Sequence, residues 1–87
     1  MLGLLKWRRD SVGGIGVYKA EFEWCFRKIR CVIRNWGPKT VKGAELDVQI
    51  KIGDLWRSMR VEHYWTVKEA KEKAETLALQ CAAETPI

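Results

Sequence analysis

The chain has 87 residues, of which 47% are hydrophobic and 31% charged, a composition that excludes an intrinsically disordered protein. The length predicts a single small domain over residues 1–87, with a correspondingly small core. The formal net charge is +5, and the N-terminal half carries it: residues 1–42 hold ten basic and three acidic side chains, whereas residues 43–87 hold six and eight. Such a field favours nucleic acid or an acidic protein as partner, although ordinary solubility charge is an alternative explanation.

Cysteine usage and hydropathy indicate the compartment. The cysteines are odd in number and sit inside apolar patterns, which predicts reduced thiols and a cytoplasmic location; they are Cys25, Cys31 and Cys81. Residues 1–5 are apolar but too few for a secretory signal, and no run approaches the length that spans a bilayer. We therefore expect a protein without a membrane partner.

The first sixteen residues carry a weak structural signal. Gly13-Gly14 separates a short basic stretch from the rest, so residues 1–16 are expected to form a flexible arm or an edge strand. The glycines continue to Gly16, but no Lys-Ser/Thr pair follows them, and a phosphate-binding loop requires that pair. A linker is the better interpretation.

Residues 21–39 mix aromatic, basic and cysteine side chains and fit two secondary structures. Read as a helix, the apolar residues of 18–36 fall within one arc of about 120°, and Gly37-Pro38 ends it. Read as a strand, the segment has an apolar face and a largely basic face: Ile29, Cys31 and Ile33 against Lys28, Arg30, Val32 and Arg34. A slip at Arg27-Lys28 then requires a bulge or a turn. We favour a strand over residues 28–34, because its residue types are strand formers and a two-stranded hairpin alone supports a helix poorly.

Residues 44–65 read as a hairpin. Residues 44–52 alternate apolar and polar side chains, Gly53-Asp54 marks a tight turn, and residues 55–65 alternate again. The alternation of the second strand predicts two faces: Met59, Val61 and Trp65 on one, and Trp56, Ser58, Arg60, Glu62 and Tyr64 on the other. The second set would share the outer face of the sheet with Arg30 and Arg34.

The last element is predicted to be a helix. Thr66 is placed to cap it, and Glu69 completes a capping box. Apolar residues recur at helical spacing and form one stripe: Val67, Ala70, Ala74, Leu77, Ala78 and Cys81. Because alanine permits close approach, we expect the stripe to cover a sheet. The predicted fold is α+β: an antiparallel three-stranded, possibly four-stranded, sheet with a C-terminal amphipathic helix packed on one face.

Residues 29–79 resemble the C-terminal two-thirds of a double-stranded RNA-binding domain. That family runs strand, Gly-Pro loop, two strands and a helix opened by Ser or Thr with lysines and an alanine ladder, here IRCVIRNWGPK, DVQIKIGD and TVKEAKEKAETLAL. The resemblance implies that Lys39 enters a minor groove and that Lys68 and Lys71 meet phosphates. The chain departs from the family in having Val67 where the first helical lysine stands and no helix before the sheet.

No pattern indicates an enzyme, a metal site or a cofactor. The chain has a single histidine, and five residues separate Cys25 from Cys31, so the ligands for a metal are lacking. Cysteine and His63 also show no spacing typical of a nucleophile and its base. We therefore predict a binding protein that has no cofactor.

Two functions fit a chain with five tryptophans and this charge. The first is a small basic module that binds RNA or DNA through a basic and aromatic sheet face. Its candidate contact residues are Lys28, Arg30, Arg34, Lys39, Lys42, Trp56, Arg60, Lys68 and Lys71. The alternative is a compact inhibitor of a host protein complex, such as phages and mobile elements encode, for example an anti-CRISPR-like protein. Its partner would be a protein with an acidic docking surface or one that itself binds nucleic acid. The number of tryptophans also has a purely structural explanation, in which they cap the core or lie in a homodimer interface.

Overall fold

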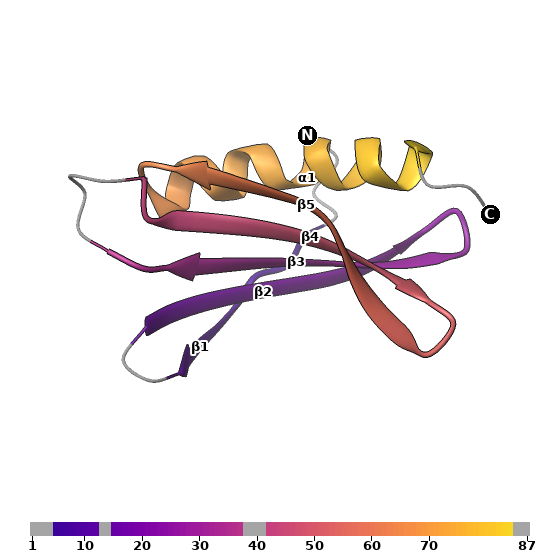
Figure 1. Cartoon of the computed structure of the whole chain (residues 1–87), viewed down its shortest axis with the longest axis horizontal. Helices are drawn as coiled ribbons and strands as arrows, with labels where there is room; N and C mark the ends of the chain where they lie inside the picture. Colours follow the sequence, from indigo (N-terminus) through magenta and orange to yellow (C-terminus); the bar gives the residue numbers. More distant parts are fainter. Residues whose placement is uncertain (1–4, 13–14, 38–41, 85–87) are drawn as a thin grey trace.

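The computed structural model describes residues 5–12, 15–37 and 42–84 and contains one sheet and one helix. The elements are β1 (Arg8–Val12), β2 (Ile15–Trp24), β3 (Arg27–Asn35), β4 (Ala44–Ile52), β5 (Leu55–Tyr64) and α1 (Val67–Glu84). All neighbouring strands pair antiparallel in the order β1-β2-β3-β4-β5 (Figure 1). The predicted α+β class and C-terminal helix are confirmed, but the predicted count of three or four strands is too low, because five are present.

The two additional strands are β1 and β2, which precede β3. Residues 8–12, within the segment expected to be a flexible arm or an edge strand, form the edge strand β1, and β2 pairs with β3 through a two-residue turn at Cys25 and Phe26. The turn accounts for the slip seen at Arg27-Lys28. Both turn residues have left-handed backbone angles, with φ of 52° and 64°. Two-residue hairpins favour this geometry because it matches the twist of the strands.

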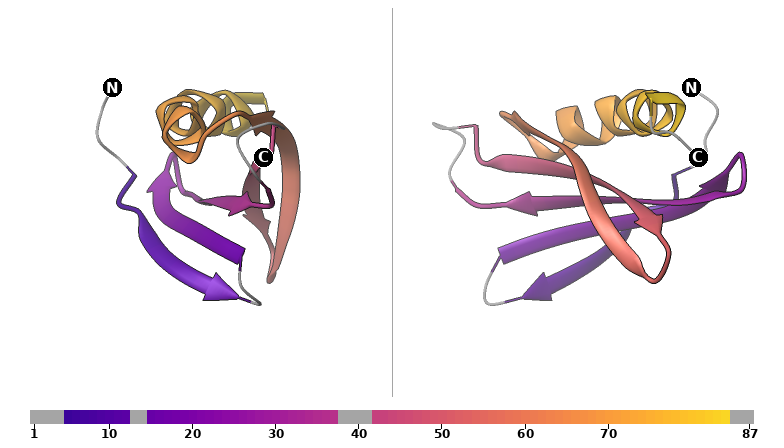
Figure 2. Two further views of the ribbon diagram at one scale, coloured as in Figure 1. Left: turned by 90° about the vertical axis from the view of Figure 1, so that its left-hand side faces the viewer. Right: turned by 45° about the vertical axis from the view of Figure 1, so that its right-hand side comes forward.

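The core lies between α1 and the inner faces of β3 and β4. Ile29, Ile33, Leu46 and Ile50 are fully buried against a helix stripe that includes Ala74. Alanines let the helix approach closely, so the long aliphatic side chains of the sheet fill the interface. The two views of Figure 2 show α1 against one face of the twisted sheet. No described element covers the opposite face, here called the open face.

The antiparallel register brings loops together at two opposite ends of the sheet. At one end Asn35 pairs with Ala44, and Ala44 pairs with Tyr64, so the segment after β3 lies near the start of α1. At the other end lie the two tight turns, β2–β3 and β4–β5 (Figure 1). The end of the sheet near the start of α1 is here called the loop end, and the end with the two tight turns is called the turn end.

A β-bulge in β5 overturns the predicted faces of that strand. Val48 pairs with Arg60 and Gln49 with Ser58, so Met59 is an extra residue. The bulge shifts the alternation: Trp56, Ser58, Val61 and His63 lie on the open face, and Arg60, Glu62 and Tyr64 lie on the helix face. The prediction that Arg60 and Tyr64 share the outer face with Trp56 is therefore wrong. Tyr64 packs against the core.

Candidate nucleic-acid interface

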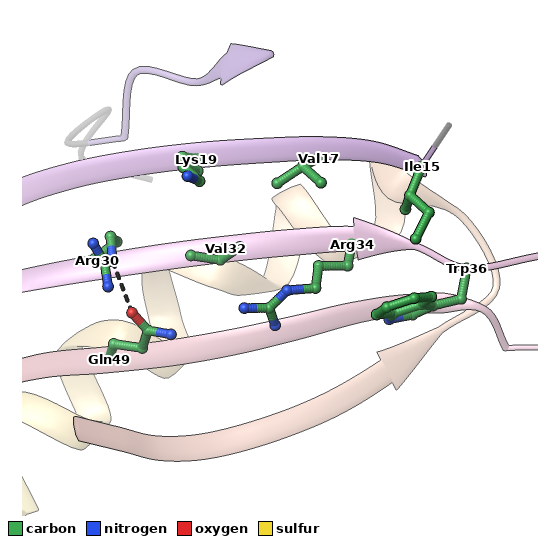
Figure 3. Close-up of a pocket in the computed structure, with 8 residues that line it drawn as sticks. All are labelled: Ile15, Val17, Lys19, Arg30, Val32, Arg34, Trp36 and Gln49. Carbon is green, nitrogen blue, oxygen red and sulfur yellow. Dashed lines mark hydrogen bonds between the residues drawn. The ribbon is translucent and has the colours of Figure 1, made fainter. Parts of the chain in front are cut away.

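A hollow of about 270 Å³ lies on the open face over β2, β3 and β4. Figure 3 shows the side chains that line it: Ile15, Val17, Lys19, Arg30, Val32, Arg34, Trp36 and Gln49. The floor is apolar, because Val17 and Val32 form it. Both side chains are buried, although no described element lies above them. Long polar side chains surround this floor, and Trp36 stands at the loop end of the hollow (Figure 3). The hollow therefore offers an apolar base, one aromatic wall and several hydrogen-bonding groups.

Arg30 is held in place by three neighbours. Its Nε donates a hydrogen bond of 2.7 Å to Oε1 of Gln49, the residue opposite it on β4. Its Nη1 lies 3.8 Å from Oε1 of Glu21, and its guanidinium carbon lies 4.3 Å from the centre of the Trp56 ring. Arg30 and Trp56 were both predicted on the outer face of the sheet, and the structure brings these two together. A stacked and hydrogen-bonded guanidinium is preorganised to meet a further planar group.

Arg34 is neutralised by carboxylates. Its Nη1 lies 3.0 Å from Oε1 of Glu45 and 3.5 Å from Oδ2 of Asp47. Asp47 is buried, and it also accepts hydrogen bonds of 2.7 Å from Gln49 Nε2 and 2.6 Å from Ser58 Oγ. This network ties β3, β4 and β5 together on the open face. Arg34 therefore stabilises the sheet, and its charge is largely compensated within the chain.

The charge of the hollow is balanced by its own acids. Its three cations Lys19, Arg30 and Arg34 form ion pairs with four carboxylates: Asp10, Glu21, Glu45 and Asp47. The hollow is therefore not the basic surface that the sequence predicted for this face. A polyanion would gain little from long-range electrostatic attraction to the hollow. Basic residues outside the hollow must therefore supply the attraction.

The loop end carries exposed aromatic and basic side chains. Trp36 is 56% exposed and Trp65 47% exposed, and the Lys42 ammonium lies 5.6 Å from the centre of the Trp65 ring. Lys68 is exposed in the first turn of α1. Neither lysine forms an ion pair with a described carboxylate. Because Trp36 also lines the hollow, the loop end and the hollow form one continuous surface.

The base of the loop between β3 and β4 is fixed by backbone contacts. The Trp36 N–H donates a hydrogen bond of 2.8 Å to the carbonyl oxygen of Gly43. A Cβ added at Gly43 would lie 2.9 Å from the backbone nitrogen of Gly37, closer than real Cβ atoms approach, so this position requires glycine. The loop base thus orients Trp36. Lys39, which the resemblance implied as a groove contact, lies outside the described residues.

A second basic and aromatic cluster lies between Lys71 of α1, Tyr18 of β2 and Trp7. The Lys71 ammonium lies 4.4 Å from the centre of the Tyr18 ring and 5.8 Å from that of Trp7. Arg9 lies 5.8 Å from the same Tyr18 ring. Trp7 and Tyr18 also pack against the core, so Lys71 covers core aromatics.

The structure thus divides the predicted contact residues among several surfaces. Arg30 and Arg34 line the hollow, and Trp56 lies outside its lining but stacks on Arg30. Lys42 and Lys68 lie at the loop end. Lys28 is exposed toward the turn end. Arg60 lies on the helix face beside Glu62, 2.8 Å away.

Sequence reasoning missed the residues that shape the hollow: Ile15, Val17, Lys19, Val32, Trp36 and Gln49. Of these, Trp36 gave a usable signal, because a tryptophan directly before Gly-Pro is poorly placed for a core position.

Burial disfavours the nucleophilic thiolate form of both core cysteines. Burial raises the pKa of Cys31 to about 12, with smaller contributions from Cys81 and Asp47, and burial also raises the pKa of Cys81. Among the described residues no three His, Cys, Asp or Glu side chains are grouped closely enough to hold a metal ion. In the same residues, no helix has the length and apolarity needed to cross a membrane.

Comparisons with protein-family models, with curated proteins and with solved structures found no match.

Proposed function

We propose that the protein binds nucleic acid through the hollow and the adjoining loop end, and that it prefers unpaired bases. The observation that carries the proposal is the hollow itself, whose apolar floor is covered by no described element and which is bounded by the exposed Trp36. Uncovered sheet faces with exposed aromatic side chains are a common platform on which bases stack.

The hollow has the size and chemistry to receive one base. Its volume of about 270 Å³ is below the ~300–1,000 Å³ typical of sites for drug-sized ligands. A base would stack on Trp36 and rest on Val17 and Val32, while Gln49 and Arg30 offer hydrogen bonds to its edge. A base inside a duplex presents neither face for such stacking, so the hollow favours a single strand.

The lysines of the loop end are the expected phosphate contacts. Lys42 and Lys68 have no described carboxylate partner, whereas Arg30 and Arg34 have. The start of α1 adds a favourable electrostatic contribution, because helix N-termini attract anions. The resemblance to double-stranded RNA-binding domains also assigns Lys68 to phosphate contact, and its strand, loop, strand, strand, helix order is that of β3 to α1.

A matched pair of tryptophan variants tests the proposal. The chain offers Trp36 at the hollow and Trp24 at the turn end, 56% and 36% exposed. Binding of labelled single-stranded RNA and DNA would be followed by fluorescence anisotropy. Trp36→Ala is expected to lower affinity about 5- to 150-fold, since a stacked base contributes ~1–3 kcal/mol. Trp24→Ala should bind as the unmodified protein does. Equal effects of the two substitutions would contradict the proposed site.

Inhibition of a host protein complex is the second candidate function. It is favoured by the balanced charge of the open face and by the apolar turn end, where Phe26 is 99% and Leu55 71% exposed. Aromatic side chains of this kind are typical of protein interfaces. This function predicts no affinity for nucleic acid at physiological salt and a nuclease-resistant complex with one protein.

A further inference from the structure

The two edges of the sheet are constructed differently. β1 is five residues long and presents Arg8, Arg9 and Asp10, the charged and short kind of edge that discourages pairing with another chain. β5 is ten residues long, and among its exposed apolar side chains are Leu55, Met59 and Val61. No described strand pairs with its outer edge. β5 is therefore the edge that a further strand can extend.

The bulge at Met59 decides which strand fits this edge. Before the bulge, Leu55 and Arg57 lie on the helix face; after it, Arg60, Glu62 and Tyr64 do. The open face receives Trp56 and Ser58 before the bulge and Val61 and His63 after it. An added strand must match both halves, because directly opposed residues in an antiparallel pair share one face.

A second copy of β5 meets this requirement in one register. If the two-fold axis passes between Met59 and Arg60, the opposed pairs are Leu55 with Tyr64, Trp56 with His63, Arg57 with Glu62, and Ser58 with Val61. Each pair joins residues of the same face, and Arg57 meets the oppositely charged Glu62 twice, once on each side of the axis. Without the extra residue, Arg57 and Glu62 would lie on opposite faces.

Neighbouring registers are less favourable. A shift by one residue opposes side chains of different faces, which the period of two forbids. The register that opposes Arg57 to Arg60 keeps the faces but places like charges together. A bulge ordinarily protects an edge against a regular strand. Two identical bulged strands, however, carry the same irregularity at the same place.

We propose that two copies of the chain pair through β5 in this register. The five strands of each copy then form one continuous sheet, with both helices on one side and both open faces on the other. This interaction is isologous, so each copy contributes the same residues. It is independent of the proposed nucleic-acid binding, although it would place two hollows on one face.

Charge reversal tests the register. The dimer dissociation constant of the full chain would be measured by sedimentation equilibrium, with circular dichroism as the check on folding. Arg57→Glu and Glu62→Arg are each expected to weaken the dimer roughly ten- to hundred-fold, because each creates two like-charge pairs. The combination R57E/E62R should restore affinity to within about five-fold of the unmodified chain. Lys73→Glu, an exposed helix residue, is the matched control and should leave the dimer unchanged.

Three results would overturn the proposal. The first is a monomer at every concentration up to about 1 mM, which excludes a dimer with a dissociation constant below the millimolar range. The second is a single reversal that dimerises as tightly as the unmodified chain, and the third is a double variant that stays as weak as the single ones. Arg57 forms no described ion pair, so its reversal is not expected to disturb the monomer. Glu62→Arg also removes the ion pair of Glu62 with Arg60 within one chain, so Arg57→Glu is the decisive single variant.

Discussion

Arg34 lies with its Nη1 3.0 Å from Oε1 of Glu45, directly across the β3–β4 ladder. This pair means that an arginine of the predicted binding face works chiefly as a structural link. Arg34→Glu would place a third carboxylate beside Glu45 and Asp47 and should lower the free energy of unfolding by several kcal/mol, on the order found when a partly buried pair is broken. Urea denaturation measures this. Lys28→Glu, an exposed site on the same strand, should change stability by less than about 0.5 kcal/mol. Equal losses in the two variants would contradict a structural role for Arg34.

A substitution in the turn between β2 and β3 should raise the stability of the protein. Phe26 has a φ of 64° and its side chain is almost fully exposed, so its left-handed backbone is not offset by packing within the described chain. Phe26→Gly is expected to raise the free energy of unfolding by about 1 kcal/mol, because glycine adopts this conformation without the clash. Gly53→Ala, at φ of 63° in the other turn with nothing within 4 Å of an added Cβ, should do the reverse. Thermal unfolding of both variants checks the sign, and destabilisation by Phe26→Gly would show that Phe26 packs in the native state.

The start of α1 gives a third expectation. The Glu69 N–H donates a hydrogen bond of 3.1 Å to Thr66 Oγ1, as the sequence predicted. Thr66→Ala should cost about 1 kcal/mol, and Thr66→Ser, which keeps the acceptor, much less. Chemical denaturation of the three proteins measures both differences. If serine and alanine were equally destabilising, the loss would come from the methyl group and not from the cap.

The thiols should respond to pH and to reagents unequally. Because burial raises the pKa of Cys31 from 9.0 to about 12, its neutral form is favoured in the folded state. Its contribution to stability is therefore constant below pH 9 and is lost as the pH rises through 12. At pH 8 a disulfide reagent should label the exposed Cys25 rapidly, and Cys31 and Cys81 only on unfolding. Three equally fast thiols would contradict this burial.

The parts of the fold that could be predicted are those in which apolar residues recur with a regular period. The alternation over β4 and the alanine stripe of α1 are regular, so their type, faces and capping residue were all predicted. Cys25-Phe26 was not recognised as a turn, because neither residue is Gly, Asn or Asp, the residues that tolerate positive φ. Nothing near Met59 marks a bulge, and one extra residue exchanges the faces of half a strand.

The candidate site was less predictable than the fold. Which cations are free depends on cross-strand neighbours, and the sequence shows Arg34 and Lys42 as equivalent positive charges. The register gives Arg34 two carboxylates and leaves Lys42 stacked on Trp65. Val32 was predicted on the outer face of its strand and Val17 was given no face, yet both side chains are buried on the open face.

Salt-dependent titration of single-stranded RNA and DNA tests the central claim most directly. Binding should be detectable at about 150 mM salt, and the logarithm of the association constant should fall linearly with that of the salt concentration, by about 0.7 for each phosphate contacted. Replacing Lys42 and Lys68 together by Gln should reduce the slope by about 1.4, whereas the same change at Lys51 and Lys73 should leave it unaltered. No binding at tens of micromolar protein with single strands or duplexes, or an equal slope in both double variants, would contradict nucleic-acid binding at the loop end.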